Sequence, residues 1–306
     1  MLAQIALLTL EMLRRTNLFA YLALLSVCFF WGTTYVGIRI ALEGLPPALL
    51  VSVRYWLSGG ILLTAALLRG MPLPRGRELL VAIGSGILVL GIGNGFLAFA
   101  EQTVPSGLAS LFVTTSPFWL VGIEAVWGGE RLHWPTLGGM AVGFCGTALL
   151  VAPGGVAVDR SMWIGFVLLQ IGIIGWCFGS IFQRRSPSSV HPLVTAGVQQ
   201  LTAGLLYLPV MLLLPHHPAV WSARVIWAVI YLVIFGSLVG YSGYIIAMNR
   251  LPVSIVSVYP YVNSVVAVWL GWLFYREAFG LREFISMLII FAGVGIVKWQ
   301  GSRRAL

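Results

Sequence analysis

Residues 105–130, PSGLASLFVTTSPFWLVGIEAVWGGE, and residues 252–277, PVSIVSVYPYVNSVVAVWLGWLFYRE, align without a gap at an offset of 147. Each copy begins with proline, continues as an apolar run and ends on an acidic residue, Glu130 or Glu277. A further apolar run follows each glutamate, and the match continues through it. The chain therefore contains the same segment twice.

The duplication extends over most of the chain. Upstream of these segments, the match continues at an offset of 145. Equivalent pairs in that region are Trp31 and Trp176, Arg39 and Arg184, Pro47 and Pro192, and Gly59 and Gly204. A soluble solenoid is excluded because it needs several short repeats, not two of roughly 145 residues. In membrane proteins, two long repeats are typical of secondary transporters, which hold their substrate between the halves.

The composition is that of a membrane protein. The chain is 59% hydrophobic and only 9% charged, with a mean hydropathy of +0.96, whereas soluble domains are about 25% charged. Apolar stretches of about 20 residues match a hydrocarbon layer of about 30 Å. The predicted spans cover residues 18–40, 47–69, 78–100, 105–127, 134–152, 162–182, 192–214, 223–246, 252–273 and 283–300. We therefore expect an all-α bundle of ten transmembrane helices in two five-helix repeats, residues 18–152 and 162–300.

An odd number of spans per repeat determines the relation between the repeats. The second copy must enter the membrane from the side opposite to the first, so the repeats are predicted to be inverted. Inverted repeats can pack in two asymmetric ways, and exchange between them opens a central cavity alternately to each side.

The net charge of +9 follows the predicted topology. Under ten alternating spans, 12 of the 18 basic residues fall on one side, five on the other, and Arg54 lies within a span. Positive charge marks the cytoplasmic side, so both termini, Ser188 and Ser189 are expected inside. Asp159 and the His216-His217 loop are expected outside. A nucleic-acid partner is not predicted, whereas contact with membrane lipid is.

Neither a metal site nor a cofactor is predicted. The three cysteines lie within spans and lack paired spacing, which favours a packing role. The histidines lie outside the spans, and a metal at His216-His217 is the alternative to a solvated loop. Residues 1–16 lack the order of a secretory signal. Either Met12 is the true start, or this segment forms a short interfacial helix.

Prolines and glycines indicate which helices bend and which pack closely. Pro117 and Pro260 lie inside the spans that Pro105 and Pro252 open, and each is expected to bend its helix. Exposed backbone at membrane depth is tolerated beside protein or a wet cavity, so these helices are expected to form cavity walls. Close packing, within the bundle or along a homodimer seam, is predicted at the glycine pairs Gly91 and Gly95, Gly139 and Gly143, Gly175 and Gly179, and Gly236 and Gly240.

Several short motifs, taken together, resemble the EamA-type transporters of the drug/metabolite transporter superfamily. In the first half they are Trp31-Gly32-Thr33-Thr34-Tyr35, Pro46-Pro47, Arg54-Tyr55, Gly93-Asn94-Gly95, Ala100-Glu101 and Val104-Pro105-Ser106-Gly107. In the second half they are Trp176-Cys177-Phe178-Gly179-Ser180, Phe235-Gly236-Ser237, Tyr261-Val262-Asn263 and Val265-Val266-Ala267. The resemblance covers about residues 18–300. It implies a ten-helix inner-membrane carrier that usually exports metabolites, amino acids or drugs.

One position departs from the family pattern. The family's second repeat usually has proline after the asparagine, and the repeat offset also places a proline there, opposite Pro117. This chain has Ser264 instead, with Pro260 one turn earlier. The bend in this helix is therefore expected to be displaced.

A substrate site is predicted from aromatic and polar residues that recur in both repeats. Aromatic walls with a few polar groups are typical of small-molecule sites. The candidates are Trp31, Thr34, Arg54, Asn94, Thr114, Trp176, Ser180, Tyr241, Tyr259 and Asn263. For any single aromatic residue, helix packing or an interfacial position is the alternative.

Two ionisable residues have candidate functions. Arg54 at membrane depth is expected to face the bundle interior. There it either captures a substrate carboxylate or pairs with Glu101 or Glu43. Glu101 lies on the same helical face as Asn94, so it is either a proton-coupling residue at the cavity or a capping carboxylate.

The sequence favours transport over catalysis. Gly240-Tyr241-Ser242-Gly243 resembles a serine-protease motif, but no histidine lies within a span to serve as base. The only lysine, Lys298, lies outside any phosphate-binding loop. The predicted function is therefore secondary export of small metabolites or amino acids by alternating access. A multidrug exporter and a non-transporting scaffold or sensor are the alternatives.

Overall fold

The computed structural model describes residues 2–128, 134–151, 159–214, 217–251, 253–256, 258–277 and 279–302. Within these ranges, every regular element is a helix. Glu130, at the end of the first repeated segment, and His216, in the predicted outer loop, lie outside the described residues.

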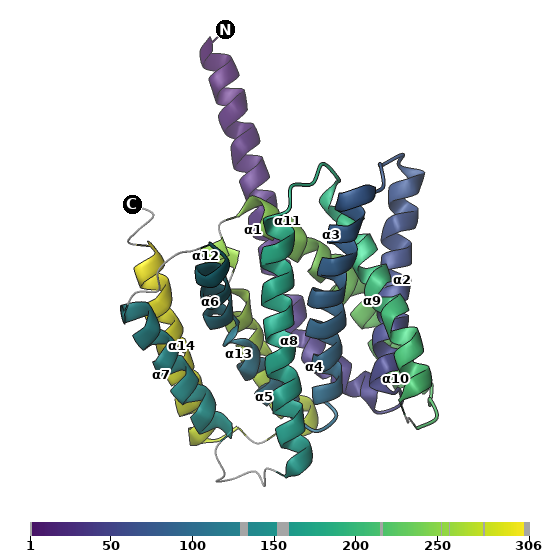
Figure 1. Ribbon diagram of the computed structural model, residues 1–306, viewed down its shortest axis with the longest axis vertical. Coiled ribbons are helices and arrows are strands. Elements are labelled where there is room, and N and C mark those ends of the chain that lie inside the picture. Colours follow the sequence, from purple (N-terminus) through teal and green to yellow (C-terminus); the bar gives the residue numbers. More distant parts are fainter. Residues whose placement is uncertain are drawn as a thin grey trace.

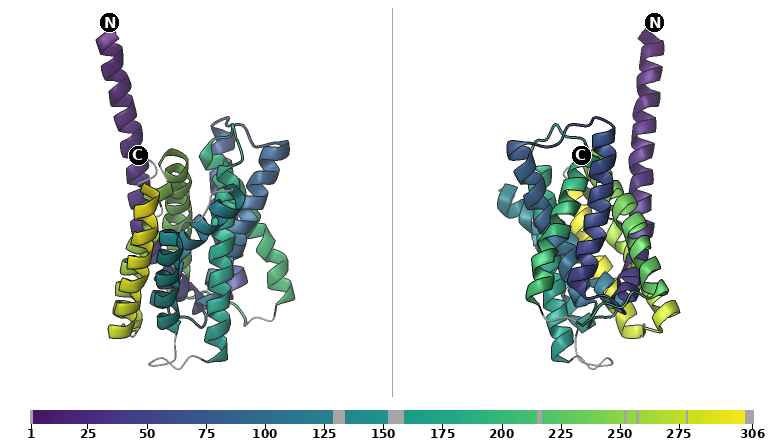
Figure 2. Two further views of the ribbon diagram at one scale, coloured as in Figure 1. Left: turned by 60° about the vertical axis from the view of Figure 1, so that its left-hand side comes forward. Right: turned by 90° about the vertical axis from the view of Figure 1, so that its right-hand side faces the viewer.

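The described part of the first half contains eight helical elements, of which α3, η1 and α4 follow one another without a loop. They are α1 (Leu2–Leu42), α2 (Pro47–Leu68), α3 (Gly76–Gly86), η1 (Ile87–Asn94), α4 (Gly95–Ala100), α5 (Ser106–Val113), α6 (Ser116–Gly128) and α7 (Trp134–Val151). Those of the second half are α8 (Arg160–Arg184), α9 (Pro192–Leu213), α10 (Ala223–Tyr231), η2 (Leu232–Tyr241), α11 (Ser242–Arg250), α12 (Val253–Val256), α13 (Tyr259–Tyr275) and α14 (Leu281–Ser302). The first part of α1 extends beyond the other helices, continuous with the rest of α1 (Figures 1 and 2).

Seven helical stretches in the described residues are long and apolar enough to cross a membrane. They are Leu18–Leu42, Pro47–Leu68, Gly76–Ala100, Ser106–Trp127, Arg160–Arg184, Pro192–Leu213 and Ala223–Arg250. The other three predicted spans coincide with α7, with α12 and α13, and with α14. The protein is thus an all-helical, multi-pass membrane protein, and the total of ten spans remains a prediction.

The two halves run in opposite directions. In Figure 1, α1 descends from the N terminus, whereas its counterpart α8 ascends towards the same end. Three helices of the first half pack directly on their counterparts in the second half: α2 on α9, α7 on α14, and α5 on α13. Likewise, α1 packs on η2 and α8 packs on η1. This is the arrangement of inverted repeats.

Glycines hold these equivalent helices close together. A Cβ on Gly204 of α9 would lie 2.5 Å from the backbone nitrogen of Trp56 in α2. A Cβ on Gly293 of α14 would lie 2.5 Å from the backbone nitrogen of Gly143 in α7. At these crossings the backbones touch, and only glycine fits. The glycines therefore serve packing within the bundle.

Two kinds of helix irregularity occur in both halves. Each half contains a π-helix, η1 or η2, in its third span, and these end at the equivalent residues Asn94 and Tyr241. π-helices are rare and often mark functional sites.

The second irregularity is a break before a proline. Helix α5 ends at Val113, four residues before Pro117, and α12 ends at Val256, four residues before Pro260. A proline ring clashes with the carbonyl four residues earlier, which explains both end points. The break in the second repeat is therefore one turn early, as expected from Pro260.

Candidate functional site

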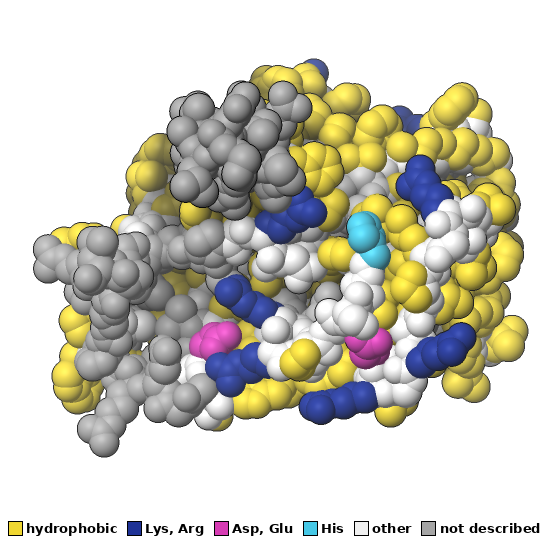
Figure 3. Space-filling view, turned by 90° about the horizontal axis from the view of Figure 1, so that it is seen from above, with side chains coloured by type: hydrophobic (Ala, Val, Ile, Leu, Met, Phe, Trp, Pro, Cys, Tyr) yellow, Lys and Arg dark blue, Asp and Glu magenta, His cyan; other side chains and the backbone are white. Residues whose placement is uncertain are grey.

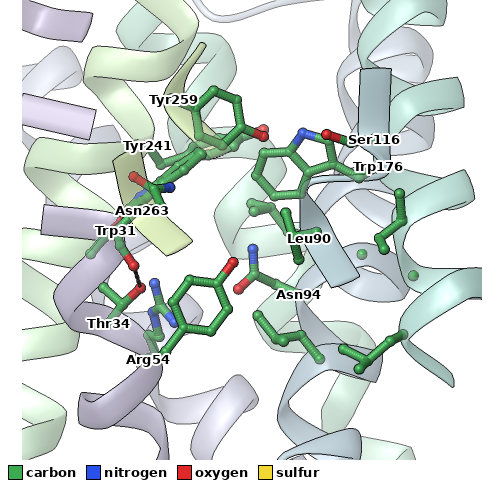
Figure 4. A pocket seen from close by; sticks show the side chains of 18 of the residues that line it. Trp31, Thr34, Arg54, Leu90, Asn94, Ser116, Trp176, Tyr241, Tyr259 and Asn263 are labelled. Atoms are coloured by element: carbon green, nitrogen blue, oxygen red, sulfur yellow. Dashed lines mark hydrogen bonds between the residues drawn. The ribbon is translucent and has the colours of Figure 1, made fainter. Parts of the chain in front are cut away.

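A cavity lies in the middle of the bundle, between the two halves. Residues from both repeats line it, and Figure 4 shows them pointing inward from several helices. The lining consists of Trp31, Thr34, Tyr35, Arg54, Tyr55, Leu90, Gly93, Asn94, Leu97, Val113, Ser116, Leu169, Gly172, Ile173, Trp176, Gly236, Tyr241, Tyr259 and Asn263. Eight of the ten predicted substrate residues are in this set.

The two others have local partners. The hydroxyl of Thr114 donates to the carbonyl of Leu111 in its own turn, at 2.6 Å. Ser180 shares a 3.0 Å hydrogen bond with the Tyr244 hydroxyl and lines a separate recess of about 280 Å³ beside Arg184. Neither residue lines the central cavity.

The polar side of the cavity is built around Arg54. This side chain is only 5% exposed, and its Nε donates to the Ser237 hydroxyl at 2.8 Å. Its guanidinium lies 5.0 Å from the centre of the Tyr55 ring. Gly236 makes room for it, because a Cβ there would lie 2.7 Å from Nη2. No carboxylate of the described residues lies within 4.0 Å of Arg54, so pairing with Glu101 or Glu43 is not seen.

Two further polar groups face the cavity near Arg54. The hydroxyl of Tyr55 is buried and has no partner among the described residues. The Asn94 side chain, at the end of η1, points into the cavity across from Arg54 (Figure 4). Burying a polar group without a partner is costly, so the Tyr55 hydroxyl favours a polar ligand.

The opposite side of the cavity is aromatic. The Trp31 ring lies 5.3 Å from each of Trp176, Tyr259 and Tyr244. Its Nε1 donates to the carbonyl of Gly236 at 2.9 Å, which fixes the ring. Such ring pairs form a rigid apolar wall with some polar edges.

Asn263 and Tyr241 are partly occupied by structural bonds. With its amide oriented to satisfy both ends, Asn263 donates to the carbonyls of Cys28 at 2.7 Å and Tyr259 at 3.0 Å. The Tyr241 hydroxyl donates to Gln199 at 2.8 Å. These residues shape the cavity and have less capacity left for a ligand than Arg54.

Glu101 lies outside the cavity, unlike the cavity position considered from the sequence. It directly follows α4, two turns beyond Asn94, which places it about 10 Å further along the helix axis. It is 2% exposed, and neither carboxylate oxygen has a hydrogen-bond partner among the described residues. Its depth along the helix axis separates Glu101 from the lining.

Sequence reasoning missed several lining residues, notably Tyr35, Tyr55 and Ser116. Tyr35 and Tyr55 directly follow the predicted Thr34 and Arg54, so a search of their immediate neighbours would have found them. Ser116 lies at the break between α5 and α6, where the backbone turns towards the cavity.

An all-helical membrane bundle with two opposed halves and a cavity between them belongs to the class of transporters with inverted repeats. The model of the EamA-like transporter family matches residues 18–152 and 163–299. The chain belongs to this family, which confirms the resemblance found in the sequence.

Comparisons with individual proteins agree with this assignment. The "Uncharacterized inner membrane transporter YedA" of Escherichia coli strain K12 is 35% identical over 277 residues, covering 89% of this chain and 88% of YedA. The "Probable terminal-alkyne amino-acid exporter" of Streptantibioticus cattleyicolor is 29% identical over 257 residues, covering 81% of this chain and 84% of that exporter. A crystal structure superposes with a TM-score of 0.68 at 25% identity, covering 93% of this chain and 98% of the other.

Proposed function

We propose that this membrane transporter is a secondary exporter of small metabolites or amino acids that carry a carboxylate. The observation that carries the proposal is Arg54, a buried guanidinium with no carboxylate partner among the described residues, in a cavity between the two repeats. Alternating access then follows from the inverted repeats.

The charge of the cavity supports an anionic group on the substrate. Arg54 is the only formally charged residue in the described lining. A buried charge without a partner is costly, and an incoming carboxylate offsets that cost with paired hydrogen bonds. A hydrophobic cation meets repulsion instead.

The aromatic wall supports a substrate whose remaining part is apolar or aromatic. It is also the observation that favours the second candidate, a multidrug exporter of hydrophobic compounds. The exporter from Streptantibioticus cattleyicolor, described as acting on an amino acid, favours the first candidate.

The breaks in the helices support movement around the cavity. Helices α5 and α13 touch each other, and each lies next to a proline break. A break of this kind allows one part of a helix to tilt without disturbing the other. We infer that exchange between the two packings involves these segments.

We further propose that the protein lies in the inner membrane with both termini in the cytoplasm. The relative YedA is named as an inner membrane transporter. At the end where α1 begins, Figure 3 shows basic side chains spread over the surface. Arginines flank the helices there, at positions 69, 75, 77, 184, 185 and 250. Cysteine labelling in intact cells tests this, because label at position 159 but not 188 is expected, and the reverse inverts the topology.

Flux into liposomes tests the function directly. The purified protein is reconstituted, and counterflow is measured with labelled amino acids, other monocarboxylates and hydrophobic cations. Carboxylates are expected to exchange and cations are not. Transport of cations alone favours the multidrug exporter, and absence of all flux favours the scaffold or sensor.

A further inference from the structure

A clamp joins the two repeats at the end of the bundle opposite the N terminus. Glu277, between α13 and α14, accepts hydrogen bonds from the backbone nitrogens of Ser106 and Gly107, both at 2.9 Å. The Ser106 hydroxyl also donates to it, at 2.8 Å. Arg39 of α1 lies 3.5 Å from the same carboxylate. One side chain of the second repeat thus holds α1 and the first turn of α5 in the first repeat.

The space for this carboxylate is left by two glycines. A Cβ on Gly271 would lie 2.5 Å from Oε2 of Glu277, and a Cβ on Gly107 would lie 3.2 Å from it. Arg276 adopts a left-handed conformation at φ 52°, which turns the chain so that Glu277 reaches α5. The clamp is therefore a fitted site that joins two repeats.

A second carboxylate lies in the turn that leads into the clamped helix. Glu101 directly follows α4 and is five residues before Ser106, the first residue of α5. It is 2% exposed and has no hydrogen-bond partner among the described residues. Burial raises the pKa of its carboxyl well above the usual range, and the negative charge of Glu277 raises it further. Arg39 and Arg54 act in the opposite direction. Tyr35 of α1, which is also buried, interacts electrostatically with Glu101.

We propose that Glu101 is the proton-carrying group of this transporter and that its protonation state controls the Glu277 clamp. This inference rests on the proposed secondary transport. With the proton bound, Glu101 is neutral and the clamp stays closed. When the O–H bond breaks, the proton passes to water and a second negative charge remains beside Glu277.

Release of that proton weakens the clamp for two reasons. The buried carboxylate of Glu101 and the half-buried carboxylate of Glu277 repel each other, and both now compete for Arg39. Separation of α5 from α13 admits water to Glu101 and relieves both effects. The clamp therefore opens when Glu101 is charged and closes when it regains a proton.

The test measures opening without any substrate. Ser110 of α5 is 1% exposed and contacts α13 through its carbonyl, which accepts from Ser264 at 2.8 Å. Ser110→Cys is introduced together with Cys145→Ala, which removes the exposed native thiol. Labelling by N-ethylmaleimide is followed from about pH 6 to about pH 9, because burial raises the pKa of the Glu101 carboxyl. Rates are divided by those of unfolded protein at the same pH, and the parent without Ser110→Cys supplies the background.

The expected labelling rate rises with pH in the otherwise unchanged protein. Glu101→Gln is expected to abolish this rise and keep the slow rate. Glu277→Gln is expected to speed labelling about tenfold at all pH values, because charged hydrogen bonds are lost. Gly271→Ala, which fills the space for the carboxylate, should do the same. Glu43→Gln, which removes an exposed acid that pairs with Arg224 at the same end, should keep the rise.

The proposal is overturned if Glu101→Gln retains the pH response, or if both clamp variants label as slowly as the parent. Because labelling needs no substrate, its outcome is separate from that of the flux assay. If the liposomes show no flux but labelling still rises with pH, the proposed transport function is refuted and the clamp proposal is not. In liposomes, drive by a sodium gradient without a proton gradient refutes Glu101 as the coupling group.

Discussion

The two repeats place different residues at equivalent positions of α2 and α9, helices that pack against each other. Arg54 and Tyr55 of α2 correspond, at the offset of 145, to Gln199 and Gln200 of α9. Gln199 is fully buried and makes three side-chain hydrogen bonds within the bundle, at 2.7–2.8 Å. Arg54 makes one, to Ser237. The glutamine is committed to structure, whereas the arginine retains donors for a ligand.

The same contrast holds for the acidic residues. Glu101 corresponds, at the offset of 147, to Met248, which is neutral. The backbone irregularities, in contrast, occur in both repeats, as π-helices and as breaks before proline. The duplicated features therefore supply the mechanics of the bundle, and Arg54 and Glu101, the two ionisable candidates, both come from the first repeat.

The first prediction concerns Arg54 of α2, which differs from its counterpart Gln199, and has the largest expected effect. Arg54→Gln gives both helices glutamine, and Arg54→Ala removes the group entirely. Either change is expected to lower kcat/KM for carboxylates by about 100-fold or more. The reason is that paired hydrogen bonds between a buried guanidinium and a carboxylate contribute ~3 kcal/mol to binding. Arg54→Lys should restore little because it lacks the planar fork. Counterflow in liposomes measures this.

The control is Arg224→Gln, which removes an exposed arginine of α10 and should leave transport unchanged. A monodisperse Arg54→Ala protein that carries substrate at the normal rate would show that Arg54 is structural.

The second prediction concerns Glu101, the acidic member of the contrast. Glu101→Gln and Glu101→Met, the latter copying Met248, are expected to abolish accumulation driven by a pH gradient. Exchange of substrate should slow and lose its pH dependence, because a neutral side chain at position 101 keeps the Glu277 clamp closed. Uptake into inverted vesicles with and without an imposed gradient measures both quantities. A variant that still responds normally to the gradient excludes Glu101 from coupling, and a parent protein that ignores the gradient is a facilitator.

Much of the architecture was readable from the sequence because apolar length and duplication are strong signals. Trp31, Trp176 and Asn94, where repeat symmetry and polarity coincide, line the cavity. Thr114 lies outside this lining, because a buried hydroxyl in a helix can bond to its own turn, which sequence alone does not distinguish from ligand binding.

Other features depended on long-range contacts. The role of Glu277 was not predicted, because its partners Ser106 and Gly107 are about 170 residues away. The π-helices η1 and η2 were not predicted either, because no simple residue preference marks them. The partner of Glu124 is Arg185, at 2.6 Å, on a different span.

The third prediction compares the hydroxyl of Tyr55 with that of Tyr207. Tyr55→Phe removes a buried hydroxyl that has no protein partner among the described residues. This change should raise KM by roughly fivefold, because the loss of one neutral hydrogen bond to the substrate costs ~1 kcal/mol. The free energy of unfolding should change little. Tyr207→Phe is the matched control, because that hydroxyl donates to the Gly91 carbonyl at 2.8 Å. It should lower stability and leave KM unchanged, and equal effects of both changes would exclude Tyr55 from the site.

The last prediction has the smallest effect and concerns Pro117, whose equivalent in the second repeat is not proline. Ser264 occupies the position equivalent to Pro117, and its hydroxyl donates to the Ser110 carbonyl of α5 at 2.8 Å and to the Pro260 carbonyl at 2.8 Å. A proline there could make neither bond, so the displaced break gives α13 a polar contact with α5. Ser264→Ala should lower the free energy of unfolding by about 1 kcal/mol and change exchange rates less than twofold.

Ser110→Ala is the control for this change, since the Ser110 hydroxyl bonds only within its own turn, to Gly107 at 2.7 Å. Its effect on stability should be smaller than that of Ser264→Ala, because no contact between helices is lost. Thermal unfolding in detergent compares the two variants. If Ser110→Ala destabilises the protein as much as Ser264→Ala, the bond across α5 and α13 contributes no more than a bond within one turn, and Ser264 does not join the repeats.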